Sequence, residues 1–181
     1  MSTAQQNSQA ADAAFDTSFK NLRVRRLAGR IGAEVHDLKL SGSLDDATFN
    51  ELYAVLLKHK VVFLRGQGHL DDAEHQAFGA RFGKTVAHPT VPAREGTRIF
   101  ELDASKGGGR ADSWHTDVTF IDAFPKVSIL RGVTIPAYGG DTVWANTAAA
   151  YEGLPADLKR LAESLWAVHS NDYDYGAQRA D

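Results

Sequence analysis

The 181-residue chain contains no cysteine, and this absence excludes several kinds of protein at once. Disulfide scaffolds, zinc ribbons, iron–sulfur clusters and thiol nucleophiles all need cysteine sulfur. No apolar run approaches the roughly 20 residues that span a bilayer. The formal net charge of -3 does not favour nucleic acid as a partner. We therefore expect a cytoplasmic protein that binds neither membrane nor nucleic acid.

The composition that remains is typical of a soluble globular protein, with 43% hydrophobic and 24% charged residues. Residues 1–16 are rich in Ala, Gln and Ser and have no basic segment ahead of an apolar one. This pattern predicts a disordered N-terminal tail rather than a secretory signal. Residues 17–181 are predicted to belong to a single domain.

The spacing of apolar residues in the first half predicts a mixed α/β order of elements. Short strands are expected within residues 22–40. Apolar side chains in residues 49–57 recur at i, i+3, i+4, i+7 and i+8, which predicts a helix that begins near Asp45. Residues 61–64 then predict a short buried strand, and residues 71–82 predict a second helix.

In the second half the pattern changes to strands and loops. Strands are predicted at residues 98–102, 127–135 and 141–144, with a turn at residues 136–140. Pro155 is expected in the first turn of a last helix, because proline is tolerated there and apolar residues follow at helical spacing.

Two side chains that can bind a metal are separated by one residue in the segment WHTDVTF, residues 114–120. On an extended strand, positions i and i+2 point to the same face, so His115 and Asp117 would converge. Two histidines and one carboxylate on one face of an octahedron hold Fe(II) in non-haem oxygenases. A His-x-Asp pair also occurs by chance, and the alternative from another class is a metallohydrolase that uses the same pair to bind Zn2+ and an activated water.

A second motif, Gly-Gly-Asp-Thr at residues 139–142, places Thr142 27 residues after His115. Together, WHTDVTF and this turn resemble the taurine/2,4-dichlorophenoxyacetate dioxygenase family. The segments VVFLRGQ (residues 61–67) and FGARFG (residues 78–83) are similar to further motifs of that family. The resemblance therefore extends over most of the chain.

The resemblance implies an enzyme that uses Fe(II), 2-oxoglutarate and O2. It implies that His115 and Asp117 are iron ligands and that Thr142 binds a carboxylate of 2-oxoglutarate. It also implies that His88 and the backbone N–H of Val118 contact a small anionic substrate, a contact for which histidine is well suited. The alternative for His88 is that it only caps the loop that follows it.

Within the family, residues 87–92 and 111–114 look more like the alkyl sulfatase branch. Ala111 stands where taurine dioxygenases tend to carry an asparagine. This resemblance implies hydroxylation of the carbon next to a sulfate ester, with collapse to an aldehyde and sulfate while 2-oxoglutarate gives succinate and CO2. The alternatives are a taurine or other sulfonate dioxygenase, a metallohydrolase and a non-catalytic fragment. A homo-oligomer is also expected from the family.

The resemblance further implies a third ligand histidine far beyond Asp117, followed by an arginine that binds 2-oxoglutarate. His169 is too close to the pair to be that histidine. We therefore expect the N-terminal part of a longer protein, inactive by itself. Its mixed α/β fold is expected to have a double-stranded β-helix (jelly-roll) core with flanking helices, and the barrel is expected to be incomplete in this chain.

Overall fold

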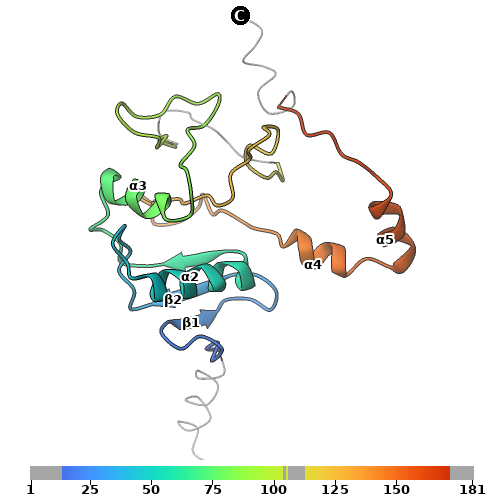
Figure 1. The fold of residues 1–181 in the computed structure, drawn as a ribbon, viewed down its shortest axis with the longest axis horizontal. Coiled ribbons are helices and arrows are strands. Elements are labelled where there is room, and N and C mark those ends of the chain that lie inside the picture. Colours follow the sequence, from blue (N-terminus) through green and yellow to red (C-terminus); the bar gives the residue numbers. More distant parts are fainter. Residues whose placement is uncertain (1–13, 104, 106–112, 172–181) are drawn as a thin grey trace, which may run out of the picture. The chain divides into compact units, whose positions relative to one another are not determined.

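The structure is a computed structural model, and it describes residues 14–103, 105 and 113–171 (Figure 1). This part of the chain is mixed α/β and forms two compact units. The first unit comprises residues 14–69 and 133–164, and the second comprises residues 70–132 and 165–171. Among the described residues, no helix has the length and apolar character that a membrane span requires.

The first unit is built on a three-stranded sheet (Figure 1). Strand β1 (Arg23–Arg26) pairs antiparallel with β2 (Ala33–His36), with Val24 opposite Val35. Strand β2 pairs in parallel with β3 (Val62–Leu64). Parallel neighbours need a crossover connection, and the chain supplies a helix between them. The short strands predicted from the sequence before residue 65 are confirmed, but β3, which was predicted to be buried, is only half-buried.

Helix α2 (Asp46–His59) is that crossover, and Asp45 caps its first turn by accepting a hydrogen bond from the N–H of Thr48 at 2.9 Å. The predicted helix is confirmed, but its inward face is rotated from the predicted one. Leu57, expected inside, is 54% exposed. The buried side chains of α2 are Phe49, Leu52, Val55 and His59.

The core of the first unit lies where α2 covers the sheet (Figure 1). Val24, Ala33 and Val55 expose 1%, 0% and 0% of their surface. Complete burial of a Val or Leu side chain contributes about 1.5–3 kcal/mol to stability. The sheet and α2 therefore form the buried, stable base of the first unit.

A buried carboxylate attaches the N-terminal segment to this base. Asp16, which the sequence assigns to the tail, is 8% exposed, and its Oδ2 lies 2.7 Å from Nζ of Lys58 and 2.9 Å from Nε2 of His59. The hydroxyl of Ser18 donates to Oδ1 at 2.6 Å. Burial raises the pKa of Asp16, but the hydrogen bonds from Lys58, Ser18 and His59 outweigh it and hold the pKa well below its usual range.

We expect Asp16→Ala to lower the free energy of unfolding by about 2 kcal/mol at pH 7, as hydrogen bonds to a charged group contribute about 1.5–3 kcal/mol. The folded-state pKa lies below the unfolded value of about 3.9, so the stabilisation is complete above that pH and declines as the pH falls below it. Urea unfolding at pH 7 and pH 3 measures the effect. The exposed Asp122→Ala serves as control, and an equal difference at both pH values would contradict the assignment.

The second unit contains helix α3 (Asp72–Ala80), as the sequence predicts. Asp71 caps it by accepting a hydrogen bond from the N–H of Glu74 at 2.8 Å. The rings of Phe78 and Phe82 meet edge to face, with centroids 5.5 Å apart. This helix is the regular element in the described part of the unit, and the remaining segments are loops and turns.

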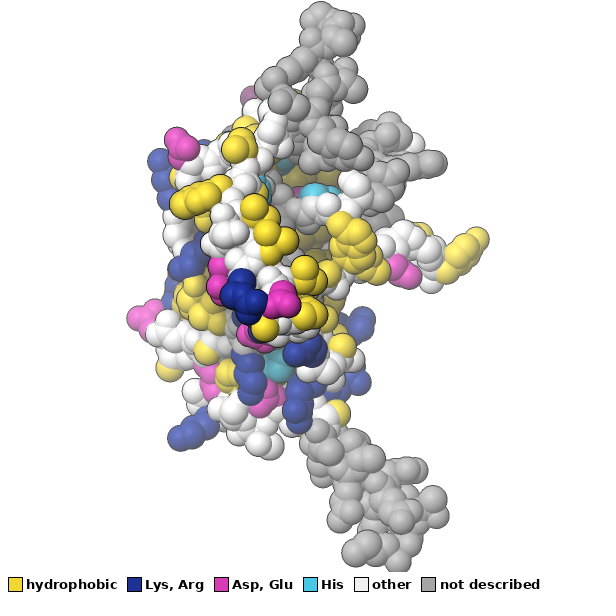
Figure 2. All heavy atoms as spheres, turned by 90° about the vertical axis from the view of Figure 1, so that its right-hand side faces the viewer, with side chains coloured by type: hydrophobic (Ala, Val, Ile, Leu, Met, Phe, Trp, Pro, Cys, Tyr) yellow, Lys and Arg dark blue, Asp and Glu magenta, His cyan; other side chains and the backbone are white. Residues whose placement is uncertain are grey.

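The strands predicted at residues 98–102, 127–135 and 141–144 are wrong for the described part of the chain, where these segments have no regular hydrogen-bonded ladder. A strand needs a neighbour that accepts and donates its backbone hydrogen bonds, and no described segment pairs with them. Apolar side chains accordingly lie on the surface, coloured yellow in Figure 2. In these segments the exposed ones are Leu102, Leu130, Val133, Ile135, Val143 and Trp144.

Two short helices complete the first unit. Helix α4 (Thr147–Glu152) is capped by Asn146, whose Nδ2 also donates to the carbonyl of Arg30 at 2.6 Å. Helix α5 (Ala156–Glu163) begins directly after Pro155, at the position predicted from the sequence. Neither helix has a buried residue.

Candidate metal centre

His115 and Asp117 meet in the second unit, with Nε2 of the imidazole 3.1 Å from Oδ1 of the carboxylate. Nδ1 of His115 lies 2.9 Å from the carbonyl oxygen of Ser113. A carbonyl oxygen only accepts hydrogen bonds, so Nδ1 carries the proton. In the neutral ring, Nε2 therefore directs a lone pair toward the carboxylate.

This arrangement fits a divalent cation. Two atoms that both carry lone pairs repel each other at 3.1 Å unless a proton or a metal ion lies between them. With metal–ligand bonds of about 2.1 Å at right angles, neighbouring ligand atoms lie about 3.0 Å apart. The side chains of His115 and Asp117 are 39% and 57% exposed, so an ion can reach them. An imidazole and a carboxylate are ligand types that Fe(II) accepts, and the Ser113 carbonyl fixes the ring orientation from outside.

A turn, not a strand, brings the two side chains together, which corrects the prediction from strand alternation. Residues 117–120 form the turn, and Val118 has a φ of 54°, in the left-handed region. A non-glycine residue there costs about 1–3 kcal/mol and ends any extended run. The Val118 side chain is buried, at 8% exposure, which helps to hold the strained backbone. The contact of its N–H with an anion stays a prediction.

His88 begins a loop in the same unit. Its Nδ1 accepts hydrogen bonds from the backbone N–H groups of Thr90 at 3.3 Å and Val91 at 3.1 Å. Its ring meets the ring of Phe100 edge to face at 5.2 Å. Burial lowers the pKa of His88, and the negative charge of Asp117 opposes this shift without reversing it. The neutral ring therefore carries its proton on Nε2, which is a hydrogen-bond donor.

Nδ1 of His88 does cap the loop, as the alternative from the sequence proposes. Because Nδ1 accepts hydrogen bonds, Nε2 is the nitrogen that donates. Both functions are compatible, since one nitrogen caps the loop and the other carries the donor proton. Substrate binding by His88 stays a prediction.

Thr142 belongs to the first unit, in an exposed segment after the predicted turn. The turn is confirmed, because Gly139 and Gly140 have φ values of 79° and 69°, which glycine adopts without strain. The structure brings His88, His115 and the turn at Val118 into one unit, while the contact of Thr142 with 2-oxoglutarate stays a prediction. Ala111 lies outside the described residues.

Other histidines make tertiary contacts that no sequence motif predicts. His59 and His75 lie on helices and are buried, at 7% and 9% exposure. His75 Nε2 lies 3.2 Å from the carbonyl oxygen of Ile129. His169 Nδ1 lies 2.8 Å from Oγ1 of Thr119, two residues beyond the metal pair. Among the described residues, no three His, Cys, Asp or Glu side chains are grouped to hold a metal.

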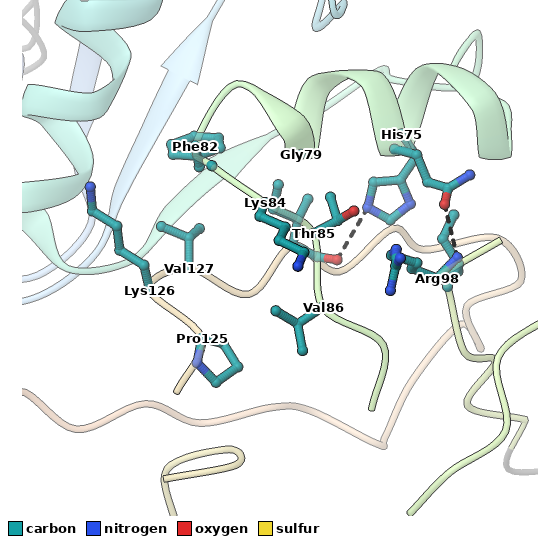
Figure 3. Close-up of a pocket in the computed structure, with 14 residues that line it drawn as sticks. His75, Gly79, Phe82, Lys84, Thr85, Val86, Arg98, Pro125, Lys126 and Val127 are labelled. Carbon is teal, nitrogen blue, oxygen red and sulfur yellow. Dashed lines mark hydrogen bonds between the residues drawn. The ribbon is translucent and has the colours of Figure 1, made fainter. Parts of the chain in front are cut away.

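A cavity of roughly 180 Å³ lies beside α3, and His75, Phe82 and Val86 are among its lining residues (Figure 3). Nδ1 of His75 is buried there without a hydrogen-bond partner. Burial lowers the pKa of His75, which keeps the ring neutral. None of the residues assigned to the candidate centre lines this cavity. We therefore treat it as a gap in the packing of α3.

A match to a known protein family covers most of the chain. Residues 23–181 match the family described as taurine catabolism dioxygenase TauD, TfdA family. The chain belongs to the TauD/TfdA family. The match includes His88, the His115–Asp117 pair and Thr142, so the residues assigned above lie inside the family domain.

Several TauD/TfdA relatives are closely similar. The chain is 58% identical over 161 residues to an alpha-ketoglutarate-dependent sulfate ester dioxygenase of Pseudomonas putida, covering 88% of this chain and 53% of that protein. It is also 58% identical to an alkylsulfatase of Acinetobacter baylyi, covering 88% and 50%. A solved taurine dioxygenase from Burkholderia xenovorans is 41% identical with a TM-score of 0.68, covering 80% and 52%. The chain spans about half the length of the curated relatives it matches.

Replacing either candidate ligand should weaken Fe(II) binding. We expect His115→Ala and Asp117→Ala to weaken Fe(II) binding by at least about 100-fold, because even residues that only orient a ligand change affinity by about 10–100-fold. Anaerobic calorimetric titration measures this. Asp122→Ala, which removes an exposed carboxylate five residues further on, should leave affinity unchanged. Tight Fe(II) binding by Asp117→Ala would show that the ligand assignment is wrong.

Proposed function

We propose that the whole protein is an Fe(II)- and 2-oxoglutarate-dependent dioxygenase that hydroxylates the carbon next to a sulfate ester. The observation that carries the proposal is the convergence of Nε2 of His115 and Oδ1 of Asp117 at 3.1 Å. It occurs in a chain 58% identical to relatives named sulfate ester dioxygenase and alkylsulfatase. Fe(II) with 2-oxoglutarate and O2, when bound, supplies the oxidising power for C–H hydroxylation.

One O2 oxidises both substrates: one oxygen atom enters the alkyl sulfate as a hydroxyl, and the other enters succinate as 2-oxoglutarate loses CO2. The product carbon then bears a hydroxyl and a sulfate. The hydroxyl loses its proton, the C=O bond forms and the bond from carbon to the sulfate oxygen breaks, which releases an aldehyde and inorganic sulfate.

Five residues of the chain have roles in this proposal. His115 and Asp117 hold the metal, and Thr142 binds a carboxylate of 2-oxoglutarate. His88 donates its Nε2 proton to a sulfate oxygen, and the backbone N–H of Val118 donates to the same group. Hydrogen bonds to an anion are stronger than neutral ones, so two fixed donors suffice to orient the ester.

The proposal also covers the fold, the localisation, the oligomeric state and the partners of the protein. We propose a jelly-roll core with flanking helices for the domain to which residues 17–181 belong. Asp16, which is buried against Lys58 and His59, belongs to this domain as well and not to the tail expected from the sequence. The TM-score of 0.68 to a solved taurine dioxygenase supports this fold. We also propose a cytoplasmic homo-oligomer that acts on a small anionic substrate and binds neither nucleic acid nor membrane.

The identity of the product separates the candidate functions. The full-length enzyme is incubated with Fe(II) and hexyl sulfate, with and without O2 and 2-oxoglutarate. We expect aldehyde, sulfate and succinate in equal amounts, and no reaction when either cosubstrate is omitted. Hexanol and sulfate formed without O2 would identify a metallohydrolase. Oxidation of taurine but not of hexyl sulfate would identify a sulfonate dioxygenase, and no turnover would favour a non-catalytic protein.

Removing the donor at His88 should affect substrate binding more than chemistry. We expect His88→Ala to raise KM for hexyl sulfate about tenfold, the effect of losing one hydrogen bond to a charged group, with a smaller change in kcat. KM for 2-oxoglutarate should stay the same. His88→Gln keeps an N–H donor and should lose less affinity. An unchanged KM for hexyl sulfate in His88→Ala would remove His88 from the substrate site.

A further inference from the structure

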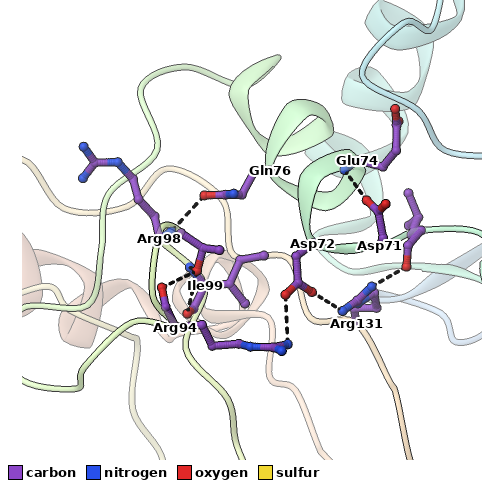
Figure 4. A network of polar contacts seen from close by, with 10 residues as sticks. Asp71, Asp72, Glu74, Gln76, Arg94, Arg98, Ile99 and Arg131 are labelled. Carbon is purple, nitrogen blue, oxygen red and sulfur yellow. Dashed lines mark hydrogen bonds and ion pairs between the residues drawn. The ribbon is translucent and has the colours of Figure 1, made fainter.

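One face of helix α3 holds the loop that starts at His88, which we call the His88 loop (residues 88–100) (Figure 4). Oδ2 of Asp72 lies 2.9 Å from Nη1 of Arg94, and Oε1 of Gln76 accepts a hydrogen bond from the backbone N–H of Arg98 at 2.8 Å. Asp72 and Gln76 are four residues apart, so they share one helix face. The two contacts therefore fasten the far part of the loop to a single rigid element.

Contacts within the His88 loop link its far part, around Arg94, to its base, where His88 and Phe100 meet. The position of the far part therefore affects the position of the base. The N–H of Arg94 donates to the carbonyl of Ile99 at 2.7 Å. At the base, the rings of His88 and Phe100 are in edge-to-face contact with centroids 5.2 Å apart. A shift of the Arg94 turn would therefore be transmitted through Ile99 and Phe100 to the His88 ring.

Asp72 is itself held in place from its other side. Its Oδ1 lies 2.5 Å from Nη2 of Arg131, and Arg131 also donates to the carbonyl of Leu70. The side chains of Asp72 and Arg131 are only 26% and 20% exposed, so solvent screens this pair less than a surface ion pair. Both carboxylate oxygens are thus engaged, which gives Asp72 one fixed orientation.

We propose that Asp72 and Gln76 are positioning residues that hold the His88 loop so that the Nε2 proton of His88 faces the sulfate group of the substrate. The inference rests on the proposed function. Neither residue contacts the reacting atoms. Their effect is to reduce the number of positions that His88 samples before the substrate binds, which improves affinity through preorganisation.

Asp72→Asn in the full-length enzyme tests the proposal, because the amide weakens both ion pairs while keeping the shape. KM for hexyl sulfate should rise about tenfold, with kcat within about twofold and KM for 2-oxoglutarate unchanged. Asp72→Glu keeps the charge and should recover most of the affinity. Glu95→Gln, which removes an exposed carboxylate of the same loop, should behave as wild type.

A double-mutant cycle with His88→Ala distinguishes positioning from a general structural effect. If Asp72 acts through His88, Asp72→Asn adds no further rise in KM once His88 is alanine. A full further rise, or an unchanged KM in the single variant, would overturn the proposal. Where Asp72→Asn does not fold, Gln76→Ala takes its place in the same cycle.

Amide hydrogen exchange measures the mobility of the His88 loop directly, so this measurement does not depend on which substrate the enzyme uses. Exchange in residues 88–100 should be faster in Asp72→Asn than in wild type and unchanged in Glu95→Gln. If the wild-type enzyme does not oxidise alkyl sulfates, the proposed function fails whatever the variants do. If it does, and exchange and KM are both unaffected by Asp72→Asn, the positioning role alone fails.

Discussion

A nitrogen lone pair and a carboxylate oxygen that lie 3.1 Å apart need positive charge between them. The surroundings of His115 and Asp117 hold these two atoms in that arrangement. The Ser113 carbonyl keeps one proton on Nδ1. The left-handed backbone of Val118 turns the chain directly after Asp117, and burial of its side chain offsets part of the strain. A divalent cation bound between the two atoms would supply that positive charge.

The irregular segments of the second unit depend on side chains for hydrogen bonds that a sheet would otherwise provide. Buried backbone groups must be paired, and the described part of this unit contains no strand ladder. Gln76 accepts from the Arg98 N–H, His75 meets the Ile129 carbonyl and Arg131 donates to the Leu70 carbonyl. These donors and acceptors belong to or contact α3. The helix therefore holds the segments that contain Arg98, Ile129 and Arg131.

The sequence predicted the features that depend on local spacing and missed those that depend on distant partners. Helices α2 and α3 follow from apolar periodicity and from Asp45 and Asp71 at their starts. The proximity of His115 and Asp117 was also predicted, but a turn at Val118 produces it and not the strand alternation from which it was predicted. Residues 127–135 alternate like a strand, yet alternation specifies side-chain faces and not the neighbour that a ladder needs. Asp72 and Gln76 carry no motif, because their partners lie 22 residues away and meet them only in the folded chain.

A neutral His88 suits the proposed reaction better than a charged one. The substrate ester carries one negative charge, whereas the released sulfate carries two, and Coulomb attraction to a cation grows with that charge. An imidazolium would therefore retain the product more strongly than the substrate. Burial against Phe100 and the N–H donors on Nδ1 both disfavour the charged ring. Affinity for the ester must then come from accurate placement of a neutral donor, and the contacts of α3 with the His88 loop supply that placement.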